Sequence, residues 1–234
     1  MTILETNLKI KGGYKQIIKW AIWAILAILL LVFLIRVIAF ENNYYHEKEG
    51  SERAVAEQVD DGSDLDETEP TDAEIGEYVV APDRPRYLTI EKLKVAKSRI
   101  LPMGVNVEGE LDTPNNIFDV GWYEGSSKPG EGGTIVIDGH NGGPHIHGVF
   151  KNLPDLAKGD IIQIERGDGA IFKYVVVENN TVALTDSNNY MSTAVQSPEP
   201  GREAVTLISC TGEWSQHRGT YLSRQFTRAV LVAD

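Results

Sequence analysis

Sixteen consecutive apolar residues, Trp20 to Ile35, constrain this chain more than any other feature of its sequence. Arg36 interrupts the run and residues 37–40 continue it, so a helix over 20–40 would be about 31 Å long, enough to cross a hydrocarbon core. A buried core helix usually carries a polar stripe, and a cleaved signal peptide has a shorter apolar core followed by small residues. Neither pattern is present. Residues 17–40 are therefore predicted to be a transmembrane signal anchor.

The charges beside this segment predict its orientation. Only Glu5 opposes the four lysines that precede the apolar run, Lys9, Lys11, Lys15 and Lys19. Because short cytoplasmic flanks are enriched in lysine and arginine, residues 1–16 are expected to be a cytoplasmic tail. The sequence thus predicts a single-pass protein of the cell membrane, with everything after Phe40 outside the cell.

A strongly acidic segment follows the predicted anchor. Residues 41–83 contain fifteen acidic residues against Lys48 and Arg53, a net charge of −13 in a chain whose total is −12. With few large apolar side chains, such a segment is predicted to be a disordered, extended linker. The acids of residues 60–66 do not follow the EF-hand pattern of calcium ligands. The acidic total also argues against a nucleic-acid partner, which would require clustered Lys and Arg.

Residues 84–234 are long enough to form a sizeable core and read as β-structure. Short runs rich in Val, Ile, Thr and aromatic residues alternate with Gly, Pro, Asn and Asp, a pattern typical of a closed barrel or a sandwich. The predicted strands are 87–90, 133–137, 161–165, 171–178, 205–209 and 229–233, with a helical turn near 149–156. The segment 185–201, between the fourth and fifth of these runs, is expected to be a loop.

Three polar residues at the ends of these predicted strands suggest acyl-transfer chemistry. Cys210, the only cysteine, ends the apolar run 205–209, and His140 follows the run 134–139. A thiol nucleophile needs such a base or positive neighbour, and the guanidinium of Arg228 can stabilise an oxyanion. The alternatives are a buried structural cysteine, a polar loop histidine and a surface arginine. The pairing of Cys210 with His140 favours the catalytic interpretation.

The motifs of the third part resemble those of the sortases, membrane-anchored cysteine transpeptidases of Gram-positive-type bacteria. The resemblance rests on TIVIDGH (134–140), VFKNL (149–153) leading to KGD (158–160), TLISC (206–210) and RAVLVA (228–233), in the family's order and spacing. Upstream, LPMGV (101–105), GWY (121–123) and PGEGG (129–133) are similar to the class D, E or F branches. The resemblance covers residues 84–234, which would be the sortase catalytic domain.

The resemblance implies an all-β fold, an eight-stranded sortase-type barrel with short helices. It implies Cys210 as nucleophile, His140 as acid and base, and Arg228 as oxyanion stabiliser. The family usually has Thr before the cysteine, so Ser209 departs from the pattern while keeping a hydroxyl that can contact substrate. The expected loop 185–201 corresponds to a region that selects the substrate, and its candidate contacts are Tyr190, Met191 and Val195.

The implied partners are surface proteins with an L-P-x-T-G-like signal near the C-terminus, and an amine of a cell-wall precursor or a pilin. No cofactor is expected. His140, His145 and His147 form an H-x4-H-x-H pattern, but the glycines around them suggest a loop and the family uses no zinc here, so no metal is expected. Two other functions remain open: a membrane-tethered cysteine protease that hydrolyses the same thioacyl intermediate, and a non-catalytic surface binding module.

Overall fold

The computed structural model describes residues 65–106 and 109–233, together with the isolated positions Trp20, Trp23 and Arg36. The chain divides into two compact units, residues 1–58 and 59–234. The predicted cytoplasmic tail, most of the predicted anchor and residues 41–64 of the predicted linker lie outside the described residues. Among the residues that are described, no helix is both long enough and apolar enough to cross a membrane.

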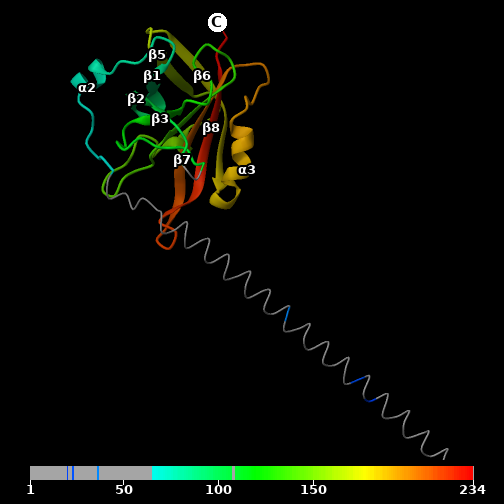
Figure 1. The fold of residues 1–234 in the computed structure, drawn as a ribbon. Helices are drawn as coiled ribbons and strands as arrows, with labels where there is room; N and C mark the ends of the chain where they lie inside the picture. Colours follow the sequence, from blue (N-terminus) through cyan, green and yellow to red (C-terminus); the bar gives the residue numbers. More distant parts are fainter. Residues whose placement is uncertain (1–19, 21–22, 24–35, 37–64, 107–108, 234) are drawn as a thin grey trace, which may run out of the picture. The chain divides into compact units, whose positions relative to one another are not determined.

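Eight strands close into a barrel in the order β1-β2-β3-β4-β7-β8-β6-β5 (Figure 1). Pairs β2–β3 and β4–β7 are parallel and the other neighbours are antiparallel. The predicted eight-stranded barrel is therefore confirmed. The strands are β1 (Pro85–Ile90), β2 (Val95–Met103), β3 (Val120–Tyr123), β4 (Thr134–Gly139), β5 (Ile161–Arg166), β6 (Ile171–Ala183), β7 (Ala204–Ser215) and β8 (Thr220–Leu231).

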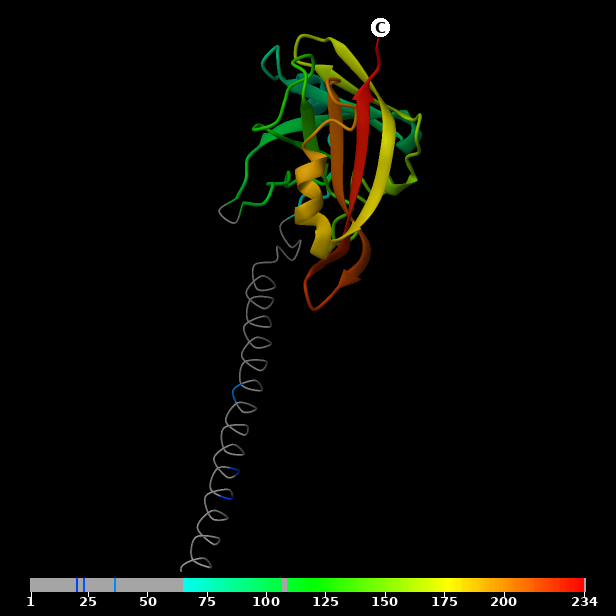
Figure 2. The same cartoon turned by 90° about the vertical axis from the view of Figure 1, so that its right-hand side faces the viewer.

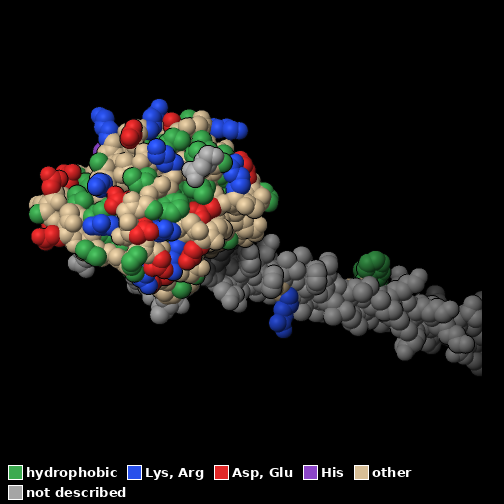
Figure 3. Space-filling view, turned by 90° about the horizontal axis from the view of Figure 1, so that it is seen from above, with side chains coloured by type: hydrophobic (Ala, Val, Ile, Leu, Met, Phe, Trp, Pro, Cys, Tyr) green, Lys and Arg blue, Asp and Glu red, His purple; other side chains and the backbone are tan. Residues whose placement is uncertain are grey.

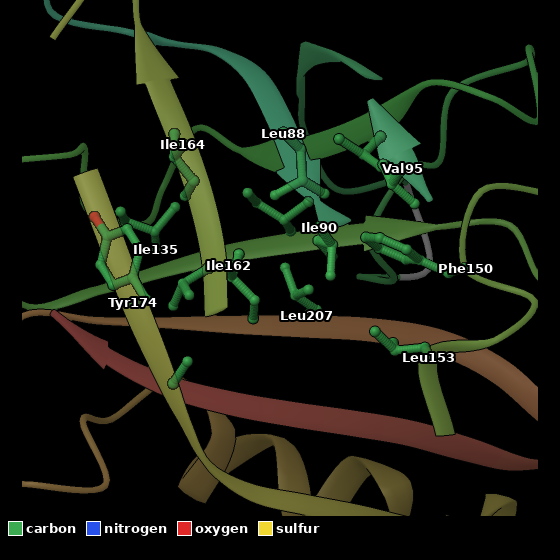
Figure 4. Packing of buried hydrophobic residues seen from close by; sticks show 14 of the residues in the cluster. Leu88, Ile90, Val95, Ile135, Phe150, Leu153, Ile162, Ile164, Tyr174 and Leu207 are labelled. Atoms are coloured by element: carbon green, nitrogen blue, oxygen red, sulfur yellow. The ribbon is translucent and has the colours of Figure 1, made fainter. Parts of the chain in front are cut away.

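The main core fills the barrel interior. Successive side chains of a strand point to opposite faces, so Ile135 and Ile137 of β4 point inward while Val136 points outward. Figure 4 shows inward side chains from several strands meeting in this core. The labelled members are Leu88, Ile90, Val95, Ile135, Phe150, Leu153, Ile162, Ile164, Tyr174 and Leu207. This packing anchors β4 and β7 rigidly.

A second, smaller apolar cluster lies on the outside of β4, β7 and β8. It consists of Val136, Ile208, Phe226 and Ala194, and partly buried residues such as Tyr190 and Met191 pack against it. Helix α3 (Leu184–Ala194) supplies the last three and lies along this side of the barrel in both views (Figures 1 and 2). We call these residues the outer apolar cluster. The expected loop 185–201 is thus helical in its first half, because tertiary packing overrides its weak helical pattern.

The six predicted strands are present, but β2 and β3 were not predicted. β2 contains Lys97, whose φ is 52°, and Pro102, which breaks the β pattern of the sequence. β3 has only four residues, including Gly121. The sequence also placed the start of β8 too late, since the strand begins at Thr220 rather than near residue 228. The predicted helical turn appears as the 3-10 helix η2 (Leu153–Asp155), and a second one, η1 (Glu91–Leu93), follows β1.

Residues 65–83, which the sequence assigned to the disordered linker, are folded onto the barrel. The backbone of Asp66 pairs with that of Asn116, donating to Asn115 O at 3.0 Å and accepting from Ile117 N at 3.0 Å. Helix α2 (Asp72–Glu77) begins with a capping box at Thr71. The hydroxyl of Tyr78 donates to Ile100 O at 2.6 Å. The prediction was wrong here because hydrogen bonds, which hydropathy does not register, hold this segment.

Charged side chains of both signs are mixed on the barrel surface. Figure 3 shows Lys and Arg interspersed with Asp and Glu on the face seen from above. Most of the acidic excess of the chain lies in residues 41–83, so the barrel strands carry a nearly balanced set of charges.

Candidate active site

Cys210 and His140 meet at one end of two neighbouring strands. In the parallel pair β4–β7 the last partners are Asp138 and Ile208. His140 and Cys210 each stand two residues further along the same direction, so the register places them beside each other. Parallel neighbours therefore bring together two residues that are 70 positions apart in the sequence. The structure confirms this juxtaposition, which the sequence suggested from strand ends alone.

Cys210 points to the outer face of the barrel, on the same side of β7 as Ile208 of the outer apolar cluster. Its side chain is partly buried. Burial raises the pKa of its thiol, the positive charge of Arg224 opposes that rise, and the acid Asp138 adds to it. Because the nucleophile is the thiolate, Cys210 depends on positive neighbours to ionise.

The imidazole of His140 is held by a backbone carbonyl of a distant loop. Its Nε2 lies 2.7 Å from Pro114 O. A carbonyl can only accept, so Nε2 carries a hydrogen in this geometry. The backbone of His140 is fixed as well, since its carbonyl accepts from Phe150 N at 2.9 Å and Phe150 is wholly buried in the core. One ring nitrogen and the backbone of His140 thus have defined positions.

The structure corrects the position expected for Arg228. Because β8 begins at Thr220, Arg228 lies in its second half, opposite Thr206 rather than at the rim beside Cys210. It is 4% exposed, and its guanidinium donates to Glu178 Oε2 at 2.6 Å. It also donates to two carbonyls at the end of α3, Thr193 O at 3.0 Å and Gln196 O at 2.8 Å. Arg228 is therefore bound within the fold, away from the thiol.

Arg224 occupies the place that was expected of Arg228. It is the direct cross-strand partner of Cys210 in the β7–β8 pair, where facing side chains share one face of the sheet. Its guanidinium donates to Tyr221 O at 3.0 Å, Ser223 O at 3.2 Å and Thr220 Oγ1 at 3.3 Å, contacts with its own strand. Counting outward from the 216–219 turn alone would pair Cys210 with Gln225, and the register shift between Thr211 and Trp214 brings Arg224 opposite it instead. The family ending RAVLVA misdirected the assignment.

Ser209 points into the barrel rather than to the outer face that carries Cys210, contrary to the expected substrate contact. It is 3% exposed, and its hydroxyl donates to Gly139 O at 2.9 Å. Since Gly139 precedes His140 and Ser209 precedes Cys210, this bond ties the two strands together just before these two residues. The hydroxyl therefore stabilises the site from inside the barrel.

The other three expected substrate contacts lie on or after α3. The ring of Tyr190 packs on Phe226 with centroids 4.8 Å apart, and its hydroxyl accepts from Asn180 Nδ2 at 2.9 Å. Met191 packs against the same outer apolar cluster, and Val195 is 44% exposed at the end of the helix. All three lie on the outer face that carries Cys210. Their contact with substrate stays a prediction.

A buried acid, Asp138, also belongs to this neighbourhood and was not singled out from the sequence. Thr113 Oγ1 donates to its Oδ2 at 2.6 Å. Burial raises the pKa of this carboxyl to about 7, the hydrogen bond from Thr113 opposes that rise, and Asp112 adds to it. The signal in the sequence was an acid inside the apolar run 134–139, which is unusual for a strand buried on both faces.

The two other histidines of the H-x4-H-x-H pattern have separate surroundings. His145 Nδ1 lies 2.9 Å from Glu67 Oε2, and Glu67 Oε1 accepts from the backbone nitrogens of His145 at 2.8 Å and Ile146 at 3.2 Å. His147 lines a pocket of about 260 Å³ next to η1 and β2. Within the described part of the chain, no three His, Cys, Asp or Glu side chains gather closely enough to hold a metal ion.

The chain is similar to one protein family and to several solved structures. A family model described as Sortase domain matches residues 88–232. Similar solved structures include sortase D5 of Clostridium perfringens (23% identity, 70% of this chain and 90% of that one, TM-score 0.45). Others are sortase C of Streptococcus pneumoniae (21%, 75% and 79%, 0.46) and sortase C-1 of Actinomyces oris (24%, 80% and 99%, 0.47).

No curated protein matches the chain by sequence. The family model alone spans more than half of the 234 residues, from within β1 to just past β8. Over that range, one outer face carries a cysteine, a histidine and an arginine at the same end of β4, β7 and β8. With its family-model match and this arrangement, the chain belongs to the sortases, a family of cysteine transpeptidases that act on surface proteins.

Proposed function

We propose that this protein cleaves an L-P-x-T-G-like sorting signal through Cys210 and transfers the acyl product to an amine. The observation that carries the proposal is the placement of Cys210 on β7 between His140, which follows β4, and Arg224 on β8, on the outer face of the barrel. A peptide bound on that face would present its scissile carbonyl to the sulfur. The flanking residues Tyr190, Met191 and Val195 are proposed to contact the signal.

The chemistry follows from these three side chains. The thiolate of Cys210 attacks the carbonyl carbon of the scissile bond, and the guanidinium of Arg224 stabilises the resulting oxyanion. His140 donates a proton to the leaving amine as the C–N bond breaks, which leaves a thioester on Cys210. The incoming amine then attacks the thioester, His140 removes its proton, and the sulfur leaves as thiolate.

Trapping of the acyl-enzyme tests this proposal directly. The protein is incubated with a panel of L-x-x-T-G peptides and analysed by mass spectrometry. We expect the mass to increase by the acyl fragment that precedes the cleaved bond, and Cys210→Ala to abolish that increase. If none of the peptides forms a covalent adduct at Cys210, the proposed substrate is wrong.

The acceptor decides between a transpeptidase and the alternative, a protease that hydrolyses the same intermediate. The acyl-enzyme is divided between buffer alone and buffer with oligoglycine, diaminopimelate or lysine peptides. Faster turnover with an amine, and an amide product, support transfer. Equal rates with and without amines favour hydrolysis.

We also propose that the catalytic domain lies outside the cell behind an N-terminal anchor. The proposal rests on the apolar run 20–35 and the four preceding lysines. Proteinase added to intact cells is expected to remove the domain that follows Phe40. Protection of that domain would contradict both the orientation and the role in surface-protein attachment.

A further inference from the structure

Asp138 stands at an unusual position for a carboxyl group. It lies in β4 between the buried residues Ile137 and Gly139, and its cross-strand partners are Gly121 on β3 and Ile208 on β7. Gly121 leaves room for it, since a Cβ there would lie 2.5 Å from Asp138 Oδ1. A carboxyl in such surroundings is costly unless it is hydrogen-bonded. The question is what this acid does two residues before His140.

Two consecutive residues of one loop hold both Asp138 and His140. The hydroxyl of Thr113 donates to Asp138 Oδ2 at 2.6 Å, and the carbonyl of Pro114 lies 2.7 Å from His140 Nε2. Proline fixes its own φ, so the Thr113–Pro114 step has little freedom to move one contact without the other. The position of the His140 imidazole therefore depends on the hydrogen bond between Thr113 and Asp138.

We propose that Asp138 is a positioning residue of this site, which holds the Thr113–Pro114 step against β4 and thereby fixes the ring of His140 beside Cys210. The inference rests on the proposed function, because a fixed imidazole matters for proton transfer to and from the substrate amine. It assigns a role to a residue that makes no contact with the reacting atoms.

The charge of Asp138 also acts on the thiol, and the two effects have opposite signs. The titratable or charged groups around the carboxyl are Asp112 on its loop, His140 after β4, Cys210 on β7, and Arg224 on β8 facing Cys210. An ionised Asp138 binds the Thr113 hydroxyl more strongly, since hydrogen bonds to a carboxylate are stronger than those to a neutral acid. The same negative charge makes the Cys210 thiol harder to ionise.

These opposed effects define an experiment on the full chain with Asp138→Asn. Asparagine keeps an oxygen that can accept from Thr113 but has no charge. Labelling of Cys210 by iodoacetamide at pH 8 is expected to rise by up to about tenfold, because a nearby like charge has been removed. Acyl-enzyme formation from a cleavable peptide is expected to fall about tenfold, because the weaker hydrogen bond to Thr113 holds Pro114 and therefore His140 less firmly. Its pH profile should lose the step near pH 7 that Asp138 causes.

A second variant and a control distinguish a positioning role of Asp138 from a role in folding alone. Thr113→Val removes the hydroxyl and keeps the carboxyl of Asp138, so acylation should fall while labelling at pH 8 rises less than in Asp138→Asn. Asp155→Asn changes an exposed acid on η2 and serves as the control for net charge. It should leave both rates and the pH profile unchanged.

Three outcomes would overturn the inference. The first is an Asp138→Asn variant with wild-type rates and pH profile. The second is a parallel loss of labelling, acylation and melting temperature, which would mean that Asp138 serves the fold alone. The third is normal acylation by Thr113→Val. If the wild-type chain forms no acyl-enzyme at all, the proposed function fails, and the labelling comparison still tests whether Asp138 acts on Cys210.

Discussion

Replacing Arg228 and Arg224 in turn separates an arginine that stabilises the fold from the one proposed to stabilise the oxyanion. In Arg228→Met the side chain keeps much of its volume and loses its hydrogen bonds to Glu178, Thr193 O and Gln196 O. Removing one partner of a buried ion pair typically costs about 3–5 kcal/mol. Because the Glu178 side chain is 39% exposed and can be solvated by water, the lower end of that range, about 3 kcal/mol, is expected.

For a domain of this size, 1 kcal/mol shifts the melting temperature by about 2–4 °C, so Arg228→Met should lower it by about 6–12 °C. The matched variant Arg224→Met should melt within about 2 °C of wild type, since its guanidinium contacts only its own strand. Its acylation rate should fall by about 10²–10³-fold, the usual loss when one oxyanion donor is removed.

The assay is thermal unfolding followed by circular dichroism, together with acyl-enzyme formation measured well below the melting temperature of each variant. If Arg228→Met melts like wild type and is inactive, while Arg224→Met acylates normally, the register argument for β8 is refuted. Arg228→Lys is a useful intermediate. Lysine keeps the charge for Glu178 but cannot reach both carbonyls as the planar guanidinium does, so a smaller loss of stability is expected.

Three further outcomes follow from the contacts around the site. Glu67→Gln should slow acylation at least several-fold, because it weakens the hydrogen bonds that hold the backbone of His145 and Ile146. Peptide kinetics measure the effect, and Glu69→Gln, which changes an exposed acid, is the control. Deletion of residues 41–64 should leave activity on soluble peptides unchanged. Deletion of residues 41–70 should reduce that activity, because Glu67 is lost. Equal activities of the two deletion variants would contradict a role of residues 65–70 in the site. The raised pKa of Asp138, about 7 against an ordinary 3.8, means that its favourable contribution to stability is complete below pH 3.8 and disappears as pH rises through 7. Urea unfolding should therefore show a loss of at most about 4 kcal/mol over that range in wild type that is absent in Asp138→Asn.

Residues 65–83 of the predicted linker are folded, which the sequence alone did not predict. Residues 65–83 have the composition of a solvated tether, yet Asp66 and Glu67 pair with loops next to His140. The groups that bind them are backbone nitrogens and carbonyls of residues 115–117 and 145–146. Backbone groups are the same in every sequence, so only the tertiary fold decides which of them are free to bind a distant carboxylate.

The sequence by itself predicted six of the eight strands and the candidate pair Cys210 and His140, and its resemblance to the sortases predicted the eight-stranded barrel. Alternating and β-branched runs predict strands from local chemistry, and Cys210 and His140 each end such a run. The tertiary structure decided which arginine joins them. The β7–β8 pairing brings Arg224 opposite Cys210, and the β6–β8 pairing brings Arg228 opposite Glu178. The β7–β8 register depends on where the turn closes and on the shift between Thr211 and Trp214. The same holds for Ser209 and Asp138, whose roles follow from the face of the strand on which each side chain lies.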